Sequence, residues 1–147
     1  MAPVIEVKNL KKYFSVSAGQ LHAVDDVSIA IERGRTLGVV GESGCGKSTL
    51  GRTIIHLQDA TDGEIFLNGE NITHLNAAGL KKARQKMQII FQDPYSSLNP
   101  RMTIMDIIRD PLKVYGWRGK ELDHQVALLM SRVGIEPRLA SSYPHEL

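Results

Sequence analysis

The chain has 147 residues, of which 42% are hydrophobic and 23% are charged, enough for one globular domain with a real core and not clearly enough for two. Its net charge of +2 and pI near 8.7 are too mild to indicate a nucleic-acid partner. No apolar stretch approaches the roughly 18 residues of a membrane span, and the N-terminus lacks a signal-peptide pattern, so we expect a cytoplasmic compartment. The single Cys45 and the scattered histidines favour neither an internal disulfide nor a structural zinc site.

The first part of the chain is predicted to be rich in strands. Residues 4–10 alternate apolar and polar side chains, and residues 24–31 form a second candidate strand that is closed by a turn at 32–34. Residues 36–41 (TLGVVG) are a short apolar run of the kind that is buried on both faces in a parallel sheet. A helix is predicted over residues 47–56. Its core-facing side chains are predicted to be Leu50, Ile54 and Leu57.

A hairpin, a basic helix and another buried strand are predicted next. Residues 64–67 read as a strand, preceded by a turn at Asp62 and Gly63 and followed by an Asn68-Gly69 turn, which is a strong hairpin signal. Residues 87–92 (MQIIFQ) form a second candidate for a buried strand. Between them lies a helical-looking stretch whose basic residues are interpreted as a solvated helix face: Lys81, Lys82, Arg84 and Lys86.

The chain is predicted to be helical beyond residue 92. A loop with two prolines at residues 93–103 leads into a helix that runs into Pro111, and a second amphipathic helix follows. The two apolar faces are predicted to comprise Ile104, Ile107 and Ile108 in the first helix, and Leu122, Val126, Leu129, Met130 and Val133 in the second. We therefore expect a strand-rich part at residues 1–92 and a helical subdomain at 93–147.

The motif with the clearest chemistry is a glycine-rich loop. Residues 41–49 (GESGCGKST) fit the phosphate-binding pattern G-x-x-x-x-G-K-[ST], with a predicted strand before and a predicted helix after. The glycines permit positive φ, so the backbone amides can surround an anion at the positive end of the helix. Lys47 can reach the β and γ phosphates, and the Ser48 hydroxyl can bind Mg²⁺. The predicted binding set is Gly41, Glu42, Ser43, Gly44, Cys45, Gly46, Lys47, Ser48 and Thr49.

A phosphate loop alone leaves GTPases, kinases, helicases and transport ATPases open. No N-K-x-D tetrapeptide, the element with which GTPases read guanine, occurs in the sequence. Small-molecule kinases place the loop close to the N-terminus, whereas here β-rich residues 1–40 precede it and require a role of their own.

The segment LKKYF together with LHAVDDVSIAIERGRTLGVVGESGCGKST resembles the N-terminal antiparallel β-subdomain of an ABC-type ATPase leading into its Walker A loop. The resemblance implies the α/β fold of a P-loop NTPase, here an incomplete ABC nucleotide-binding domain with ATP and Mg²⁺ as cofactors. It also implies an aromatic side chain that stacks on adenine just past the first strand. Phe14 matches that position best, and Tyr13 is the alternative, one residue away.

A second matching element is IIFQDP at residues 89–94, which resembles the Q-loop of the same family. The resemblance implies that Gln92 reaches Mg²⁺ and the attacking water, which makes it, with Lys47, a catalytic candidate. It also implies that this loop touches a membrane subunit and couples nucleotide state to transport.

The longer runs QDPYSSLNPRMTI and YPHEL are similar to the ATP-binding subunits of dipeptide and oligopeptide permeases, a group that includes nickel and glutathione importers. The form GESGCGKST with SLNPRMTI looks most like the second of the paired ATPase subunits. The resemblance implies a peripheral protein at the cytoplasmic face of the membrane that energises import, with a second ATPase subunit, transmembrane permease subunits and, indirectly, an extracytoplasmic solute-binding protein as partners. The alternative is a soluble ABC ATPase acting in translation or DNA repair.

In the family that the chain resembles, further nucleotide-site motifs follow YPHEL. The resemblance makes Leu147 the first residue of the LSGGQ signature, and it places the Walker B aspartate, the catalytic glutamate and the switch histidine further on. His145 precedes the signature and does not match the switch histidine. We therefore expect residues 1–147 alone to bind nucleotide weakly and not to turn it over.

Overall fold

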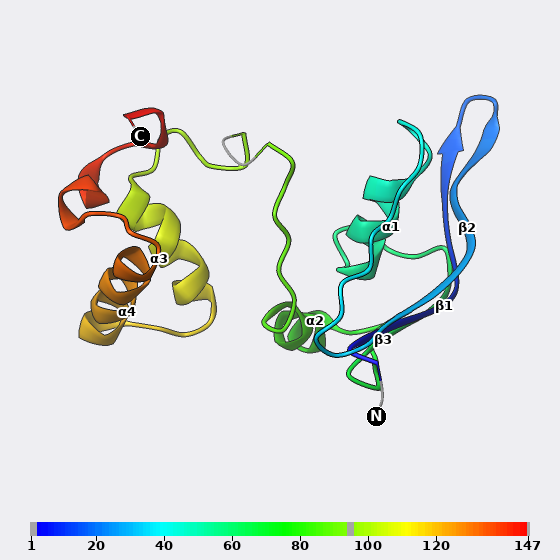
Figure 1. Cartoon of the computed structure of the whole chain (residues 1–147), viewed down its shortest axis with the longest axis horizontal. Coiled ribbons are helices and arrows are strands. Elements are labelled where there is room, and N and C mark those ends of the chain that lie inside the picture. The colour runs from blue at the N-terminus through cyan, green and yellow to red at the C-terminus, as the bar shows by residue number, and fades with distance from the viewer. Residues whose placement is uncertain (1–2, 94–95, 147) are drawn as a thin grey trace. The chain divides into compact units, whose positions relative to one another are not determined.

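The computed structural model of the chain describes residues 3–93 and 96–146, and it divides into two compact units at residues 1–89 and 90–147 (Figure 1). Pro94 and Tyr95 of the predicted loop, and Leu147 of the predicted signature, lie outside the described residues. Each unit has its own hydrophobic cluster. No helix among the described residues is long and apolar enough to cross a membrane.

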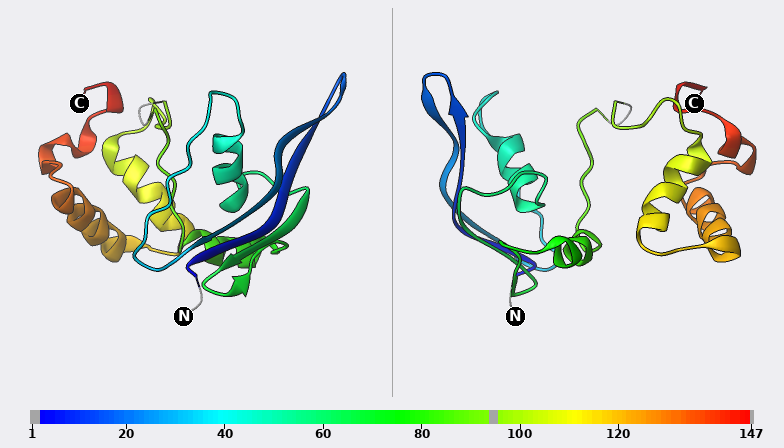
Figure 2. Two further views of the ribbon diagram at one scale, coloured as in Figure 1. Left: turned by 45° about the vertical axis from the view of Figure 1, so that its right-hand side comes forward. Right: turned by 180° about the vertical axis from the view of Figure 1, so that it is seen from behind.

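The first unit is built on a four-stranded antiparallel sheet in the order β2-β1-β3-β4. The strands are β1 (Ile5–Val16), β2 (Gly19–Ile31), β3 (Asp62–Leu67) and β4 (Glu70–Asn71), and β1 and β2 form a long hairpin (Figures 1 and 2). The predicted strands at 4–10 and 24–31 are confirmed as the half of this hairpin that lies far from its turn. The half next to the turn was not predicted, although Gly19 (φ 127°) marks the turn.

The predicted turn between β3 and β4 is confirmed. Asn68 (φ 51°) and Gly69 (φ 81°) both have positive φ, as a tight two-residue hairpin turn requires. One face of the sheet carries the core, because apolar residues alternate along the strands. The buried cluster comprises Val7, Leu10, Val24, Leu50, Ile65, Leu67, Ile72 and Ala83.

Two helices accompany this sheet, α1 (Lys47–Ile54) and α2 (Ala77–Arg84). Helix α1 packs Leu50 and Ile54 against the core as predicted, but Leu57 is exposed because the helix has ended before it. Helix α2 begins where the Asn76 side chain accepts a hydrogen bond from the Gly79 amide at 2.8 Å. Its lysines are solvated as interpreted, and so is Arg84, which also donates to the His56 carbonyl at 2.7 Å.

The two predicted buried strands at 36–41 and 87–92 are wrong for this structure. Neither segment is a strand, and Val40 and Ile90 are 92% and 91% exposed. The physical reason is that an apolar run becomes a strand only beside another strand that pairs its backbone groups, and no described residue pairs with either segment in a sheet.

The second unit consists of α3 (Ile104–Val114) and α4 (Gly119–Arg132), followed by the short 3₁₀ turns η1 (Pro137–Ser141) and η2 (Pro144–Glu146). Both predicted helices are confirmed, and α3 begins at the Thr103 hydroxyl, which accepts from the Asp106 amide at 3.2 Å. The small core joins α4 to apolar residues of α3 and η1. It comprises Leu122, Val126 and Met130, packed against Met105, Ile108, Leu112, Ile135 and Ala140.

Two details of the helical prediction need correction. Helix α3 continues through Pro111 to Val114, since Leu112 beyond the proline packs into the core and holds the last turn in place. Val133 was predicted on the apolar face of α4, but it is the C-cap residue and is 69% exposed, because the helix ends at Arg132.

Candidate functional site

The glycine-rich loop leads directly into α1 and leaves the start of that helix open. Gly44 (φ 82°) and Gly46 (φ 96°) adopt the left-handed conformation that the motif predicts. Gly46 is the N-cap of α1, and because it has no side chain, nothing on this residue occupies the first amides of the helix. Those amides and the positive end of the helix dipole are thus available to an anion.

Lys47 is held at the centre of this loop. Its ammonium group donates to the carbonyl oxygens of Gly41 at 2.8 Å and Glu42 at 2.5 Å, and the Cys45 sulfur lies 3.6 Å away. The Cys45 amide in turn donates to the Glu42 carbonyl at 3.3 Å, which closes the loop around the lysine. An ammonium group has three N–H donors, and here all three have a partner within the loop, of which the Cys45 sulfur is the weakest acceptor.

A half-open cavity of about 330 Å³ lies between the loop and the β1–β2 hairpin. Phe14 of β1 and residues 21–23 of β2 line one side, and residues 44–49 line the other. An aromatic ring at one wall and lysine, hydroxyl and glycine groups at the other suit a ligand with a flat base and a charged tail. The structure therefore brings Phe14 together with Gly44, Cys45, Gly46, Lys47, Ser48 and Thr49.

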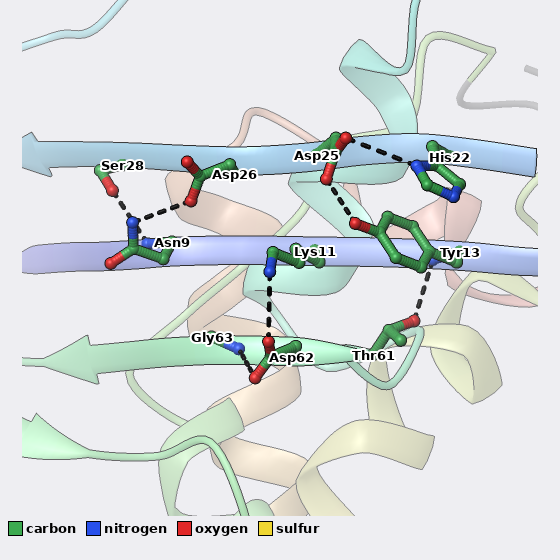
Figure 3. A network of polar contacts seen from close by, with 10 residues as sticks. All are labelled: Asn9, Lys11, Tyr13, His22, Asp25, Asp26, Ser28, Thr61, Asp62 and Gly63. Atoms are coloured by element: carbon green, nitrogen blue, oxygen red, sulfur yellow. Dashed lines mark hydrogen bonds and ion pairs between the residues drawn. The ribbon is translucent and has the colours of Figure 1, made fainter.

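Tyr13 does not line this cavity but belongs to a polar network on the hairpin (Figure 3). Its ring stacks on His22 with centroids 3.8 Å apart and planes 12° apart, and its hydroxyl donates to the Asp25 carboxylate. The backbone amide of Tyr13 donates to the Thr61 hydroxyl at 2.9 Å. The hydrogen bond to Asp25 raises the pKa of Tyr13 to about 12 and lowers the pKa of the Asp25 carboxyl.

The other predicted residues lie elsewhere. Gly41 and Glu42 contribute carbonyls to Lys47 without lining the cavity, and Ser43 is exposed next to them. Gln92 belongs to the second unit, where it is exposed in the extended segment that leads to α3. Its contact with Mg²⁺ stays a prediction, as does that of Ser48.

The contribution of β2 to the cavity was not predicted from the sequence. Leu21 and Ala23 line it because β2 folds back on β1, with Phe14 opposite Leu21 and Tyr13 opposite His22. The signal was available: a strand-forming run on each side of Ser17, Ala18 and Gly19 is typical of a hairpin.

The glycine-rich loop surrounds a lysine ammonium group at an uncapped helix start, and it lies beside the hairpin that carries Phe14. These features define a phosphate-loop nucleotide-binding domain. Within that class, the chain belongs to the ABC transporter family, whose model, described as "ABC transporter", matches residues 24–147. The prediction of the family and of its α/β fold is therefore confirmed.

Curated relatives cover almost the whole chain. The chain is 49% identical to the oligopeptide transport ATP-binding protein OppF of Bacillus subtilis (strain 168), covering 97% of this chain and 48% of that protein. It is 45% identical to the glutathione import ATP-binding protein GsiA of Pectobacterium atrosepticum, covering 98% and 24% respectively. The chain thus spans about half the length of OppF and about a quarter of the length of GsiA.

Solved structures give the same fold. The chain matches the dimeric post-hydrolysis structure of the ATP-binding cassette MJ0796 bound to ADP and Pi with a TM-score of 0.80 and 26% identity. The match covers 97% of this chain and 62% of that one. A second structure of MJ0796, described as a dimeric bacterial ABC transporter cassette, matches with the same TM-score and 27% identity over the same shares of both chains.

Proposed function

We propose that the chain is the nucleotide-binding part of an ATP-binding subunit that couples ATP binding and hydrolysis to import of peptides or a related small solute. The observation that carries the proposal is the cavity in which Phe14 faces residues 44–49, in a chain 49% identical to an oligopeptide transport ATP-binding protein. The glutathione import relative extends the solute class to small peptides in general.

Different residues of the cavity contact different parts of the nucleotide. Phe14 stacks on adenine, and the open amides at the start of α1 hold the phosphates. Lys47, which the Gly41 and Glu42 carbonyls hold in the loop, exchanges at least one of its loop contacts for an oxygen of the β or γ phosphate. The lysine therefore binds a triphosphate by a local exchange of hydrogen bonds.

Mg²⁺ fits the donor chemistry of this site. The Ser48 hydroxyl lies on the first turn of α1 at the cavity wall, and a hydroxyl with phosphate oxygens and water is the oxygen set that Mg²⁺ prefers. The ion would neutralise charge on the β and γ phosphates during hydrolysis. Gln92 would add its side-chain oxygen to this set and orient the attacking water.

The partners follow from the proposed role. A second ATPase subunit, as in the dimeric cassettes among the structural relatives, completes the nucleotide site, and permease subunits hold the protein at the cytoplasmic face of the membrane. An extracytoplasmic binding protein delivers the solute.

The proposal is tested by exchange with a relative. Residues 1–147 would replace the matching half of OppF in a Bacillus subtilis strain that lacks its own copy, and uptake of a labelled oligopeptide would be measured. The same chimera with Lys47→Ala is the control, because it loses a ligand of the phosphates.

We expect the chimera to restore uptake and Lys47→Ala to abolish it. A chimera that is produced and hydrolyses ATP but gives no uptake would contradict the import role and favour a non-transport ABC ATPase. Uptake that is unaffected by Lys47→Ala would contradict the nucleotide site itself.

A further inference from the structure

The hairpin that carries Phe14 contains a β-bulge at Ala23. Lys12 lies opposite Val24 and Tyr13 lies opposite His22, so Ala23 is an extra residue without a partner on β1. A bulge bends its strand locally and aims the unpaired residue out of the ladder. Here the bulge coincides with the point where β2 lines the cavity.

The bulge meets the phosphate loop through backbone atoms. A Cβ atom on Gly46 would lie 2.0 Å from the Ala23 carbonyl oxygen and 3.2 Å from its carbonyl carbon. Gly46 is also the N-cap of α1 and has φ 96°, so its position sets the direction of the first helical amides. The Ala23 carbonyl therefore contacts Gly46 and limits how far the anion-binding end of α1 can move towards β2.

Tyr13 ties together the two sides of this bulge. Its ring stacks on His22, the residue before Ala23, and its hydroxyl donates to Asp25, two residues after Ala23 (Figure 3). The Asp25 carboxylate also lies 3.4 Å from Nδ1 of His22, and Thr61 fixes the Tyr13 backbone from the loop before β3. Four groups from three segments thus hold the bulge from the side of Tyr13.

We propose that Tyr13 is a positioning residue for nucleotide binding, which acts by fixing the Ala23 bulge against Gly46 and does not touch the nucleotide. The inference rests on the proposed function, because it requires that the cavity binds a nucleotide. It assigns different tasks to two adjacent aromatic residues: Phe14 binds the base, and Tyr13 holds the bulge that sets the phosphate-binding end.

The contacts of Tyr13 argue against direct stacking on adenine. One face of its ring is covered by His22 and its hydroxyl is committed to Asp25, whereas Phe14 lines the cavity. His22, which covers that face of the Tyr13 ring, lines the cavity, whereas Tyr13 does not.

The two roles are separated by titrating two ligands, Mg-ATP and inorganic triphosphate with Mg²⁺, into the chain and its variants. Triphosphate has no base, so it reports on the loop alone. Tyr13→Phe removes only the hydroxyl and keeps an aromatic ring. We expect it to weaken the binding of both ligands equally, by roughly fivefold, which is the typical net contribution of one hydrogen bond. Phe14→Ala should weaken the binding of Mg-ATP more than the binding of triphosphate.

A matched control tests for a merely structural effect. The Ser28 hydroxyl accepts a hydrogen bond from the Asn9 amide at 2.9 Å, so Ser28→Ala removes another β1–β2 contact, away from the bulge. It should lower the melting temperature without changing either dissociation constant, measured well below melting. Asp25→Asn keeps an acceptor for Tyr13 and should bind both ligands more tightly than Asp25→Ala.

The outcomes distinguish this inference from the proposed function. If Tyr13→Phe binds both ligands with wild-type affinity while Lys47→Ala loses binding, the positioning role is overturned. The nucleotide site itself then stands. A Tyr13→Ala variant that loses only ATP affinity, while Tyr13→Phe binds normally, shows direct stacking and also overturns it. If Lys47→Ala equals the wild type, or the wild type binds neither ligand, the nucleotide site fails and the inference fails with it.

Discussion

The β1–β2–β3 sheet and the segments at 36–41 and 87–92 contain the same kinds of apolar residues, but they have opposite fates. Val7 and Ile65 in the sheet are 1% and 0% exposed, whereas Val40 and Ile90 are almost fully exposed. In the sheet, each strand finds a partner within about 60 residues of chain, and its backbone groups are paired. The segments flanking the phosphate loop and Gln92 find none among the described residues.

The difference shows that β-structure is a property of pairs. A hairpin supplies its own partner, whereas a strand of a parallel sheet depends on segments far away in the sequence. The cavity beside the phosphate loop depends on the part of the molecule whose strands pair locally, since Phe14 and Ala23 come from the hairpin and α1 packs on the same core. The residues that line the cavity therefore lie outside the two apolar segments, although Gly41, at the end of the first segment, holds Lys47 through its carbonyl.

The largest expected effect compares two glycines. A Cβ on Gly63 would lie 2.5–2.7 Å from backbone atoms of Asn9 and Leu10, and its φ of 93° disfavours any side chain, whereas Gly38 in the apolar segment has open space and no positive φ. We expect Gly63→Ala to reduce the free energy of unfolding by more than about 3 kcal/mol. Gly38→Ala should change it by less than about 0.5 kcal/mol. Urea unfolding measures both, and equal losses would remove the distinction between the two regions.

A second comparison uses two valines of the first unit. Val7→Ala deletes a buried methyl pair from the sheet core, and we expect a loss of about 2–3 kcal/mol from lost burial and the cavity left behind. Val40→Ala should change the free energy of unfolding by less than about 0.5 kcal/mol, because Val40 is exposed. A large loss at Val40 in the same urea experiment would mean that residues 36–41 are packed in solution.

The sequence was sufficient for the features whose causes are local. The phosphate loop, α1, the Asn68-Gly69 turn, and both helices of the second unit depend on short-range conformational rules, and the family followed from motifs such as SLNPRMTI. The outer half of the hairpin and the bulge at Ala23 were not predicted, because a one-residue register shift is invisible until both strands are aligned. For the same reason, the choice between Phe14 and Tyr13 stayed open: it depends on which face of β1 meets the loop.

A smaller effect concerns pH and the end of α1. His56 is only 8% exposed, and burial lowers the pKa of its imidazole; the Asp59 carboxylate opposes this shift, and Arg84 and His74 reinforce it. Between the lowered pKa and the unfolded value of about 6.5, the unfolded chain binds more protons. Stability should therefore be fully present above about pH 6.5 and decline as the pH falls below that value.

The assignment to His56 is checked by urea unfolding between about pH 8 and pH 5. His56→Gln should flatten the decline in the free energy of unfolding, whereas the exposed His74→Gln should leave most of it. An unchanged pH dependence in His56→Gln would show that another group is responsible.

The central claim is that the cavity between Phe14 and the phosphate loop binds an adenine nucleotide, and titration of Mg-ATP into the chain tests it most directly. Lys81→Ala, which removes an exposed lysine of α2, is the matched control for Lys47→Ala. We predict weak but saturable binding by the wild type and by Lys81→Ala, and at least about tenfold weaker binding by Lys47→Ala, since a charge-assisted contact to phosphate is lost. Equal affinity of Lys47→Ala and the wild type would contradict the account.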